Sequence, residues 1–365
     1  MKIGVIGNYG ATNIGDDAIL TAVLKSLEGH KVTIFSANPE AWKATFGTSS
    51  APLFPLGFRS CWRHGFRSSI KAMKKMDAVV LGGGGLFQDS YLYACFLWAW
   101  QIFWVKLFKK PLFIYATGVG PLKTWLGKKL TTWAYRQAEV ITVRDRYSAQ
   151  VLEELKLGKE VQISADPVFN YRKPGIAKVR TKNLFIVSLR PWLNANKKTI
   201  SVFMEVLEHL KSEKNAEFIF VIMQQIKEHD LQMIEPIVSK LGGEIYIPNN
   251  FSDLLQTMET AEFAIGMRYH FMIAAIITET PLLPITYAPK TEALFEGNPL
   301  GIYRNPVSEL STEQLTADLK RLSVGYNNAV IYEKAMSADY ADLAEKNSDL
   351  LREFLKKVDQ HSKDW

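Results

Sequence analysis

The stretch GNYGATNIGDDAIL, residues 7–20, follows a short apolar run and leads directly into a helical pattern. Residues 1–6 have the pattern of a buried strand, and the apolar residues between Ala18 and Leu24 recur on one helix face. The segment therefore predicts a strand, a glycine-rich turn and a helix, the unit that builds parallel α/β sheets. Open backbone N–H groups at such a turn favour anions. The glycine spacing matches neither the dinucleotide fingerprint nor a Walker loop, so it indicates no nucleotide class.

Composition narrows the class of protein. A chain of 365 residues with 47% hydrophobic residues is long enough for about two domains. Two cysteines, Cys61 and Cys95, make no disulfide framework, which suits a reducing compartment. Because residues 1–6 lack the basic and apolar regions of a signal peptide, we expect a bacterial-type cytoplasmic enzyme. The net charge of +7 favours an anionic partner without choosing among a phosphorylated substrate, nucleic acid and an anionic membrane.

Apolar runs that end in polar turn residues alternate with helical patterns along the chain. These runs lie at residues 31–37, 76–85, 111–120, 140–145 and 161–167, and again at 184–192, 217–225, 243–249, 263–270 and 281–290. The pattern predicts an α/β protein of two Rossmann-like domains facing a cleft, with ligands at the carboxyl ends of the strands. We place the domains at residues 1–174 and 175–365, with the basic stretch 169–183 as linker. The last helical pattern, residues 332–359, should pack back onto the first domain.

Basic residues stand where strands of the second domain end. The run VSLRPW ends on Arg190, and in FAIGMRYH a glycine turn precedes Arg268 and His270 at a helix start. Guanidinium groups and helix N-termini both bind anions, so these three residues predict a phosphate or carboxylate site. The alternative is that they are solvated surface residues.

These motifs together resemble the polysaccharide pyruvyl transferase family, whose members transfer pyruvate from phosphoenolpyruvate to a sugar of a cell-surface polysaccharide. The resemblance covers residues 1 to about 300 and rests on GNYGATNIGDDAIL, GGGGLFQD, GVGPL, VRDRYS, SLRPW and GMRYH in the family's order. It implies a two-domain architecture of the glycosyltransferase type called GT-B. It also implies that Arg190, Arg268 and His270 hold phosphoenolpyruvate, and we add Tyr269 and Lys290 to this donor site.

The chemistry of phosphoenolpyruvate fits these residues independently. Its carboxylate and phosphate need at least two cationic groups, which Arg190 and Arg268 supply. The methylene carbon must be protonated before a sugar hydroxyl adds, and we assign phosphate contact and acid catalysis to His270. Lys290 is an alternative acid or a third anion ligand, although a surface lysine is an equally good interpretation. We expect no cofactor and no metal, since no cluster of His, Cys and carboxylates has ligand spacing.

Amide and carboxylate groups of the first domain predict the acceptor site. Sugar hydroxyls need such partners, and glycines let a sugar lie against backbone. The acceptor residues that we predict are Asn8, Asn13, Asp16, Gly84, Gly85 and Asp89. Asp16 or Asp89 is the expected general base, and Asp16 counts among the catalytic residues. The alternatives are that Asp16 only caps its helix and that the glycine run, residues 82–85, only serves packing.

Two rival functions use the same features. A nucleotide-sugar-dependent GT-B glycosyltransferase or epimerase would also place a phosphate at the GMRYH helix. A non-catalytic anion-binding protein would keep the arginines and glycines but release no phosphate. For partners we expect phosphoenolpyruvate and a saccharide acceptor, lipid-linked forms included, and no nucleic acid.

Two stretches of the first domain predict peripheral membrane contact at the inner face of the plasma membrane. Residues 58–75 carry an apolar and a basic stripe, each at a spacing of four, as an interfacial helix does. Residues 91–110 are rich in tryptophan, but their uncharged run, residues 90–105, is too short to span a bilayer. The alternative is that the second stretch is buried against the sheet and the basic stripe is a solvated face.

Overall fold

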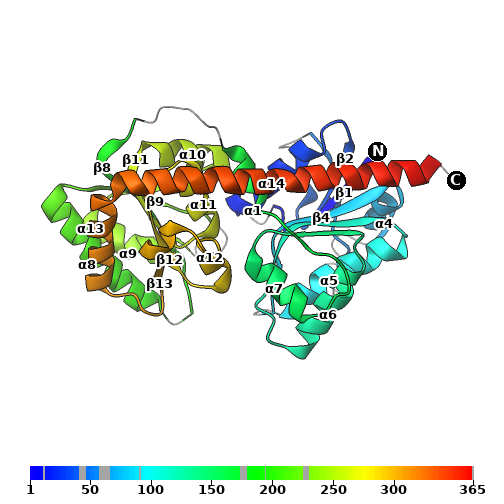
Figure 1. The fold of residues 1–365 in the computed structure, drawn as a ribbon, viewed down its shortest axis with the longest axis horizontal. Coiled ribbons are helices and arrows are strands. Elements are labelled where there is room, and N and C mark those ends of the chain that lie inside the picture. The colour runs from blue at the N-terminus through cyan, green and yellow to red at the C-terminus, as the bar shows by residue number, and fades with distance from the viewer. Residues whose placement is uncertain are drawn as a thin grey trace. The chain divides into compact units, whose positions relative to one another are not determined.

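A computed structural model describes residues 1–10, 13–40, 47–56, 66–89, 92–172, 179–193, 195–224 and 230–363. The chain divides into two compact units. The first comprises Met1–Ala11, Asp16–Asn170 and Tyr340–Trp365, and the second comprises Thr12–Gly15 and Tyr171–Asp339 (Figure 1). Residues 173–178 of the predicted linker lie outside the described residues, and a strand already begins at Thr181.

The first unit contains a parallel sheet of seven strands in the order β3-β2-β1-β4-β5-β6-β7. Its strands are β1 (Lys2–Ile6), β2 (Lys31–Ser36), β3 (Ser49–Pro52), β4 (Ala78–Phe87), β5 (Leu112–Val119), β6 (Val140–Val143) and β7 (Gln162–Ile163). The central strands are buried on both faces, which is why they appear in the sequence as continuous apolar runs. The glycine run at residues 82–85, predicted as the end of this strand, lies inside β4, which continues to Phe87.

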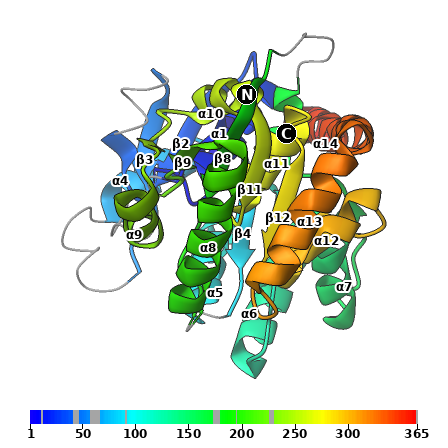
Figure 2. The ribbon, with the colours of Figure 1, turned by 90° about the vertical axis from the view of Figure 1, so that its left-hand side faces the viewer.

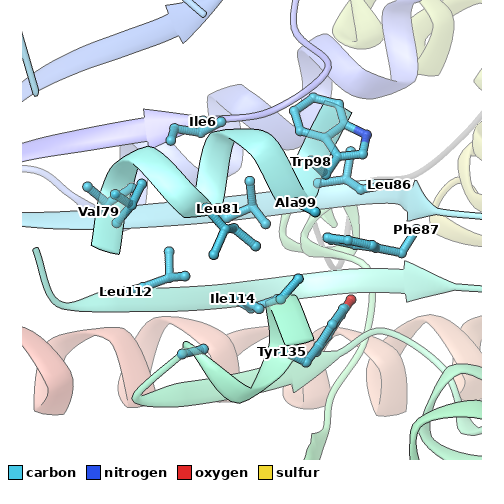
Figure 3. Close-up of a cluster of buried hydrophobic side chains, with 14 of the residues drawn as sticks. Ile6, Val79, Leu81, Leu86, Phe87, Trp98, Ala99, Leu112, Ile114 and Tyr135 are labelled. Carbon is cyan, nitrogen blue, oxygen red and sulfur yellow. The ribbon is translucent and has the colours of Figure 1, made fainter. Parts of the chain in front are cut away.

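Helices cover both faces of this sheet. One face carries α4 (Phe66–Lys74), α5 (Leu92–Leu107), α6 (Trp125–Arg136) and α7 (Arg146–Glu154) over a hydrophobic cluster. Figure 3 shows Trp98 of α5 and Tyr135 of α6 in this cluster. The other face carries α1 (Ile14–Ser26) and the end of α14 (Tyr326–Lys363). Ser26 Oγ and Ser348 Oγ lie 2.9 Å apart, and the ring centroids of Phe113 and Phe354 lie 5.6 Å apart. A 3₁₀ helix, η1 (Pro167–Tyr171), spans the boundary between the units.

The second unit contains six parallel strands in the order β10-β9-β8-β11-β12-β13. They are β8 (Thr181–Ser188), β9 (Glu217–Val221), β10 (Glu244–Tyr246), β11 (Ala261–Gly266), β12 (Leu282–Thr286) and β13 (Asn305–Pro306). The helices are α8 (Asn196–Lys214), α9 (Leu231–Leu241), α10 (Phe251–Thr260), α11 (Tyr269–Ile277), α12 (Pro289–Ala293), η3 (Pro299–Tyr303) and α13 (Thr312–Val324). In Figure 2, α8 and α13 lie in front of β11 and β12. Because β8, β11 and β12 are neighbours, their carboxyl ends bring together residues that are far apart in the sequence.

The apolar half of the stripe predicted for residues 58–75 does not face outward where the structure describes it. Phe66 and Ile70 pack against the hydrophobic cluster of the first unit, whereas Arg67 and Lys71 are exposed. The prediction of an outer apolar face on this helix is therefore wrong for these two residues, and residues 57–65 lie outside the described residues. No helix that the structure describes combines the length and the apolar character needed to cross a membrane.

Candidate functional site

Three cationic side chains follow the ends of three adjacent strands in the second unit. Arg190 follows β8, Arg268 follows β11, and Lys290 follows β12. Tyr287, directly after β12, lies among them, because its phenol interacts with all three charges. The structure therefore brings together three of the five residues predicted for the donor, and it adds a buried tyrosine.

Aromatic rings hold the Arg190 side chain. Its Nη1 donates a hydrogen bond of 2.9 Å to Tyr287 Oη. The guanidinium carbon lies 4.6 Å from the centroid of the Tyr287 ring and 5.5 Å from that of Trp192. The two rings contact each other at a centroid distance of 4.7 Å. Cation–π contacts and a charged hydrogen bond thus fix the direction of this guanidinium.

Opposing effects set the pKa of the Tyr287 phenol. Burial raises it, but the charges of Lys290, Arg190 and Arg268 lower it, together with the hydrogen bond from Arg190. The charges prevail, and the pKa falls to about 8. A cluster that stabilises a phenolate in this way also attracts other anions.

A buried carboxylate fixes Arg268. Its Nε lies 3.2 Å from each oxygen of Asp230, and Nη2 forms a further short contact with Oδ1. Asp230 is 0% exposed and also accepts hydrogen bonds from the backbone N–H groups of Met223 (3.0 Å) and Gln224 (3.2 Å). Asp230 was not predicted from the sequence, since a partner 38 residues away leaves no periodic signal. Arg268 is itself buried at 9% exposure, so it is not a solvated surface residue.

Tyr269 and His270 form the first turn of α11 and are both buried. Their rings meet edge to face at 5.4 Å. The helix N-cap is Arg268, whose side chain has no acceptor for the N–H groups of the first turn. The turn before it requires glycine, because a Cβ on Gly266 would lie 2.3 Å from Phe271 Cδ1. The predicted Lys290 lies beside Tyr287, with Nζ 5.8 Å from the ring centroid.

The segment Thr12–Gly15 groups with the second unit. Asn13 forms an isolated antiparallel bridge with Gln224. A Cβ on Gly15 would lie 1.9 Å from Nδ1 of His270, so residue 15 has no room for a side chain. Asn13 therefore belongs to the second unit, whereas the other predicted acceptor residues belong to the first.

In the first unit, the turn after β1 lies against the glycine run of β4. Asn8 Nδ2 donates to Asp16 Oδ2 at 2.9 Å, and Tyr9 Oη donates to the Gly82 carbonyl at 2.5 Å. A Cβ on Gly84, whose φ is +77°, would lie 3.2 Å from Asp16 Oδ1. The predicted acceptor residues Asn8, Asp16 and Gly84 are thus neighbours.

Two further charged groups of the first unit were not predicted from the sequence. Burial raises the pKa of Asp17 to about 6, which the charge of Asp16 also favours and a hydrogen bond from the Gly10 N–H opposes. Arg144, 3% exposed, follows β6 and lies beside the glycines of β4 and β5. Its Nη2 would lie 3.9 Å from a Cβ on Gly85. Arg144 belongs to the motif VRDRYS, which identified the chain but carried no assigned role.

Asp89 has a local structural role. Its Oδ1 accepts from the Lys123 N–H at 2.8 Å, and its Oδ2 accepts from the Thr124 N–H ahead of α6. Both oxygens therefore stabilise the loop before that helix, and the acceptor role of Asp89 stays a prediction. Within the described ranges, no three His, Cys, Asp or Glu side chains form a group that could hold a metal ion.

Solved structures with the same fold cover nearly the whole chain. UDP-GlcNAc 2-epimerase from Neisseria meningitidis, bound to UDP-GlcNAc, is 14% identical with a TM-score of 0.61 over 98% of this chain and 100% of that one. Anabaena Alr3699/HepE, in complex with UDP and glucose, is 11% identical with a TM-score of 0.65 over the same shares. S. aureus MnaA, solved with UDP, is 13% identical with a TM-score of 0.64 over 97% and 96%. These likenesses confirm the predicted GT-B-like fold of two parallel α/β domains.

Sequence comparison identifies the family. No curated protein matches the sequence. The family model described as polysaccharide pyruvyl transferase matches residues 13–289, which include Arg190, Arg268 and Tyr287 of the second unit. The chain therefore belongs to the polysaccharide pyruvyl transferase family.

Proposed function

We propose that this protein transfers the pyruvyl group of phosphoenolpyruvate to a sugar of a cell-surface polysaccharide or of its lipid-linked precursor. The products are a cyclic pyruvate ketal and phosphate. One observation carries the proposal: in a member of this family, Arg190, Arg268 and Lys290 surround the Tyr287 phenol at three adjacent strand ends. Such a cluster matches a small ligand with two anionic groups.

The donor is assigned to the second unit. Phosphoenolpyruvate offers a carboxylate and a phosphate, and two guanidinium groups can each form paired hydrogen bonds with such groups. Asp230 accepts the hydrogen bonds of Nε and Nη2 of Arg268, so a ligand would bind the guanidinium through Nη1. His270, on the first turn of α11, is assigned to the phosphate and to acid catalysis.

The proposed reaction moves protons and electron pairs only, so it needs no oxidant or reductant. A proton from His270, with Lys290 as the alternative donor, goes to C3 of phosphoenolpyruvate and leaves a cationic centre at C2. A sugar hydroxyl oxygen adds to C2 and gives up its proton to a carboxylate. The C2–O bond to phosphate then breaks, and phosphate leaves with the electron pair. A second hydroxyl of the same sugar adds to C2, loses its proton and closes the ketal.

We assign the acceptor to the first unit, with Asp16 or its neighbour Asp17 as the base. The Asp17 pKa of about 6 suits a carboxylate that takes up a proton near neutral pH. Asn8, held by Asp16 at 2.9 Å, offers an amide to a sugar hydroxyl.

The test is phosphate release from phosphoenolpyruvate with a panel of N-acetylmannosamine, glucose, galactose and N-acetylglucosamine glycosides, lipid-linked ones included. We expect release only with one acceptor class. Arg190→Ala should lower kcat/KM by a factor that corresponds to about 2 to 5 kcal/mol of lost transition-state stabilisation. Arg304→Ala, at an exposed arginine of the same unit, should leave kcat/KM unchanged. No release with any panel member would contradict the transferase and leave an anion-binding protein.

A second candidate is a nucleotide-sugar-dependent enzyme, since proteins of this fold have been solved with UDP or UDP-GlcNAc. The same assay separates the two candidates. A pyruvyl transferase should be insensitive to added UDP, whereas a nucleotide-sugar enzyme would bind UDP and ignore phosphoenolpyruvate.

A further inference from the structure

Helix α5 has two apolar faces. The residues of its buried face lie in the hydrophobic cluster against the sheet, and they are Cys95, Trp98, Ala99, Ile102 and Val105 (Figure 3). The opposite face is also apolar, with residues at alternating spacings of three and four. These residues, which we call the aromatic stripe, are Tyr93, Phe96, Trp100, Phe103 and Leu107. The alternative that this helix is simply buried therefore describes only one of its faces.

The aromatic stripe is open to solvent in the isolated chain. Tyr93 is 61% exposed and Leu107 is 55% exposed, and the two phenylalanines of the stripe are exposed as well. Trp100 is half-buried and stacks on Phe103 with their ring centroids 5.5 Å apart. Single exposed apolar residues are ordinary, but a continuous stripe along four turns of one helix indicates a contact surface.

Cationic side chains flank the stripe on both neighbouring helices. Helix α4 lies on one side, with the Phe66 ring 5.4 Å from that of Trp104 of α5, and α6 packs on the other side. The exposed cations of these two helices are Arg67, Lys71 and Lys74 on α4 and Lys128, Lys129 and Arg136 on α6. As described in the structure, Phe66–Lys74, Leu92–Leu107 and Trp125–Arg136 contain no acidic residue. Glu139, after α6, pairs with Lys106 at 3.0 Å.

Exposed tryptophans extend the surface onto α6. Trp125 is 69% exposed and Trp133 is 37% exposed, and the ammonium of Lys129 lies 4.2 Å from the Trp125 ring centroid. Tryptophan and tyrosine beside lysine are typical of segments at the headgroup level of a bilayer. The core of a protein–protein interface, by contrast, is depleted in lysine.

We propose that the outer face of α4, α5 and α6 docks on an anionic phospholipid surface. The aromatic stripe enters the interfacial layer, and the flanking cations contact the headgroups. This surface keeps the second of the two stretches expected from the sequence, residues 91–110, and takes its apolar part from the aromatic stripe instead of Phe66 and Ile70. It would bring the first unit to a bilayer, where a lipid-linked sugar would be available.

Co-sedimentation of the full chain with vesicles tests the proposal. We expect binding to phosphatidylcholine vesicles that contain phosphatidylglycerol at low salt, and about tenfold weaker binding at high salt or without the anionic lipid. Two variants separate the contributions: Lys71→Glu with Lys74→Glu removes the α4 charges, and Tyr93→Ser with Leu107→Ser removes the ends of the stripe. Each pair should lower binding about tenfold, since each removes one of the two attractions.

Matched controls lie on the second unit. Lys197→Glu with Lys198→Glu, at exposed positions of α8, makes the same change in net charge. Val324→Ser with Ile331→Ser removes two apolar residues that are 85% and 60% exposed. Both control pairs should bind vesicles like the unchanged protein.

Two results would overturn the proposal: no binding to anionic vesicles, or binding that the α4 and α5 variants do not weaken. A dimer that Tyr93→Ser with Leu107→Ser dissociates, with no vesicle binding, would assign this face to a second copy and equally overturn it.

Discussion

Replacing Tyr287 with phenylalanine tests how the cationic cluster recognises an anion. The phenol oxygen accepts a hydrogen bond of 2.9 Å from Arg190 Nη1, and the charges of Lys290, Arg190 and Arg268 lower its pKa to about 8 against the effect of burial. Bound phosphoenolpyruvate would present its carboxylate and phosphate to the same cations. A phenolate and the substrate therefore compete, and we expect the substrate to bind the form with a neutral phenol.

The magnitude follows from this pKa. At pH 9 the phenol is about nine-tenths ionised, so kcat/KM for phosphoenolpyruvate should be about tenfold lower than at its plateau near neutral pH. The second pKa of a phosphate ester is about 6, so the substrate adds no change of charge above neutral pH. Tyr287→Phe should remove the part of the alkaline decline that has its midpoint near pH 8. It should also lower the neutral plateau by about tenfold, or about 1.5 kcal/mol, because a charged hydrogen bond that positions Arg190 is lost.

The assay is acceptor-dependent phosphate release at subsaturating phosphoenolpyruvate from pH 6.5 to 9.5. Tyr303→Phe is the matched control, since Tyr303 is a buried tyrosine of the same unit whose pKa burial raises. This control should keep the alkaline decline. A decline that persists unchanged in Tyr287→Phe would refute the competition, and so would a kcat/KM that rises through pH 8 in the unchanged protein.

Three further predictions concern stability. Arg268→Ala should lower the free energy of unfolding by about 3 to 5 kcal/mol because the fully buried Asp230 loses its partner, and urea unfolding that shows no loss would contradict the pairing. Gly83→Ala should cost about 2 to 5 kcal/mol, since φ is +70° and the new Cβ would lie 1.9 Å from Ile19 Cγ2; a urea midpoint close to that of the unchanged protein would refute this. Asp17→Asn should raise Tm at pH 7 while lowering kcat. Its raised pKa of about 6 makes the ionised carboxylate unfavourable in the folded state, so the stability gain should vanish as pH falls from 6 to 4; a gain that persists at pH 4 would contradict the shift.

The central strands of both units were predictable from the sequence because their burial is nearly complete. Parallel strands covered on both faces consist of consecutive apolar residues, as in KIGVI and LFIYATGV, and such runs stand out without an alignment. The edge strand β3 has the sequence SSAP and a mixed burial pattern, so nothing marks it as a strand. The two-residue strand β13 likewise has no sequence pattern that would predict a strand. Strand ends then located Arg190 and Arg268, because function in this fold lies at carboxyl edges.

The partners of those arginines could not be predicted. Asp230 lies before α9, and only the three-dimensional fold brings it to Arg268. Tyr287 was within a recognised strand pattern, but an aromatic residue there is ordinarily part of the core. Its role becomes visible only when the neighbouring strand ends are known to carry Arg190 and Lys290.

The glycine run of β4 shows why packing and function are hard to separate in a sequence. A close approach was expected from four consecutive glycines, and the structure identifies part of what approaches: Ile19 of α1 at Gly83 and the Asp16 carboxylate at Gly84. Packing against Ile19 therefore requires glycine at residue 83, which agrees with the alternative interpretation that the glycine run serves packing. That packing also sets where the first turn of α1 lies and so positions Asp16, the carboxylate assigned to the acceptor. A side chain at residue 83 would therefore displace the proposed base together with the helix, so loss of activity in such a variant says nothing about sugar binding unless stability is measured in parallel.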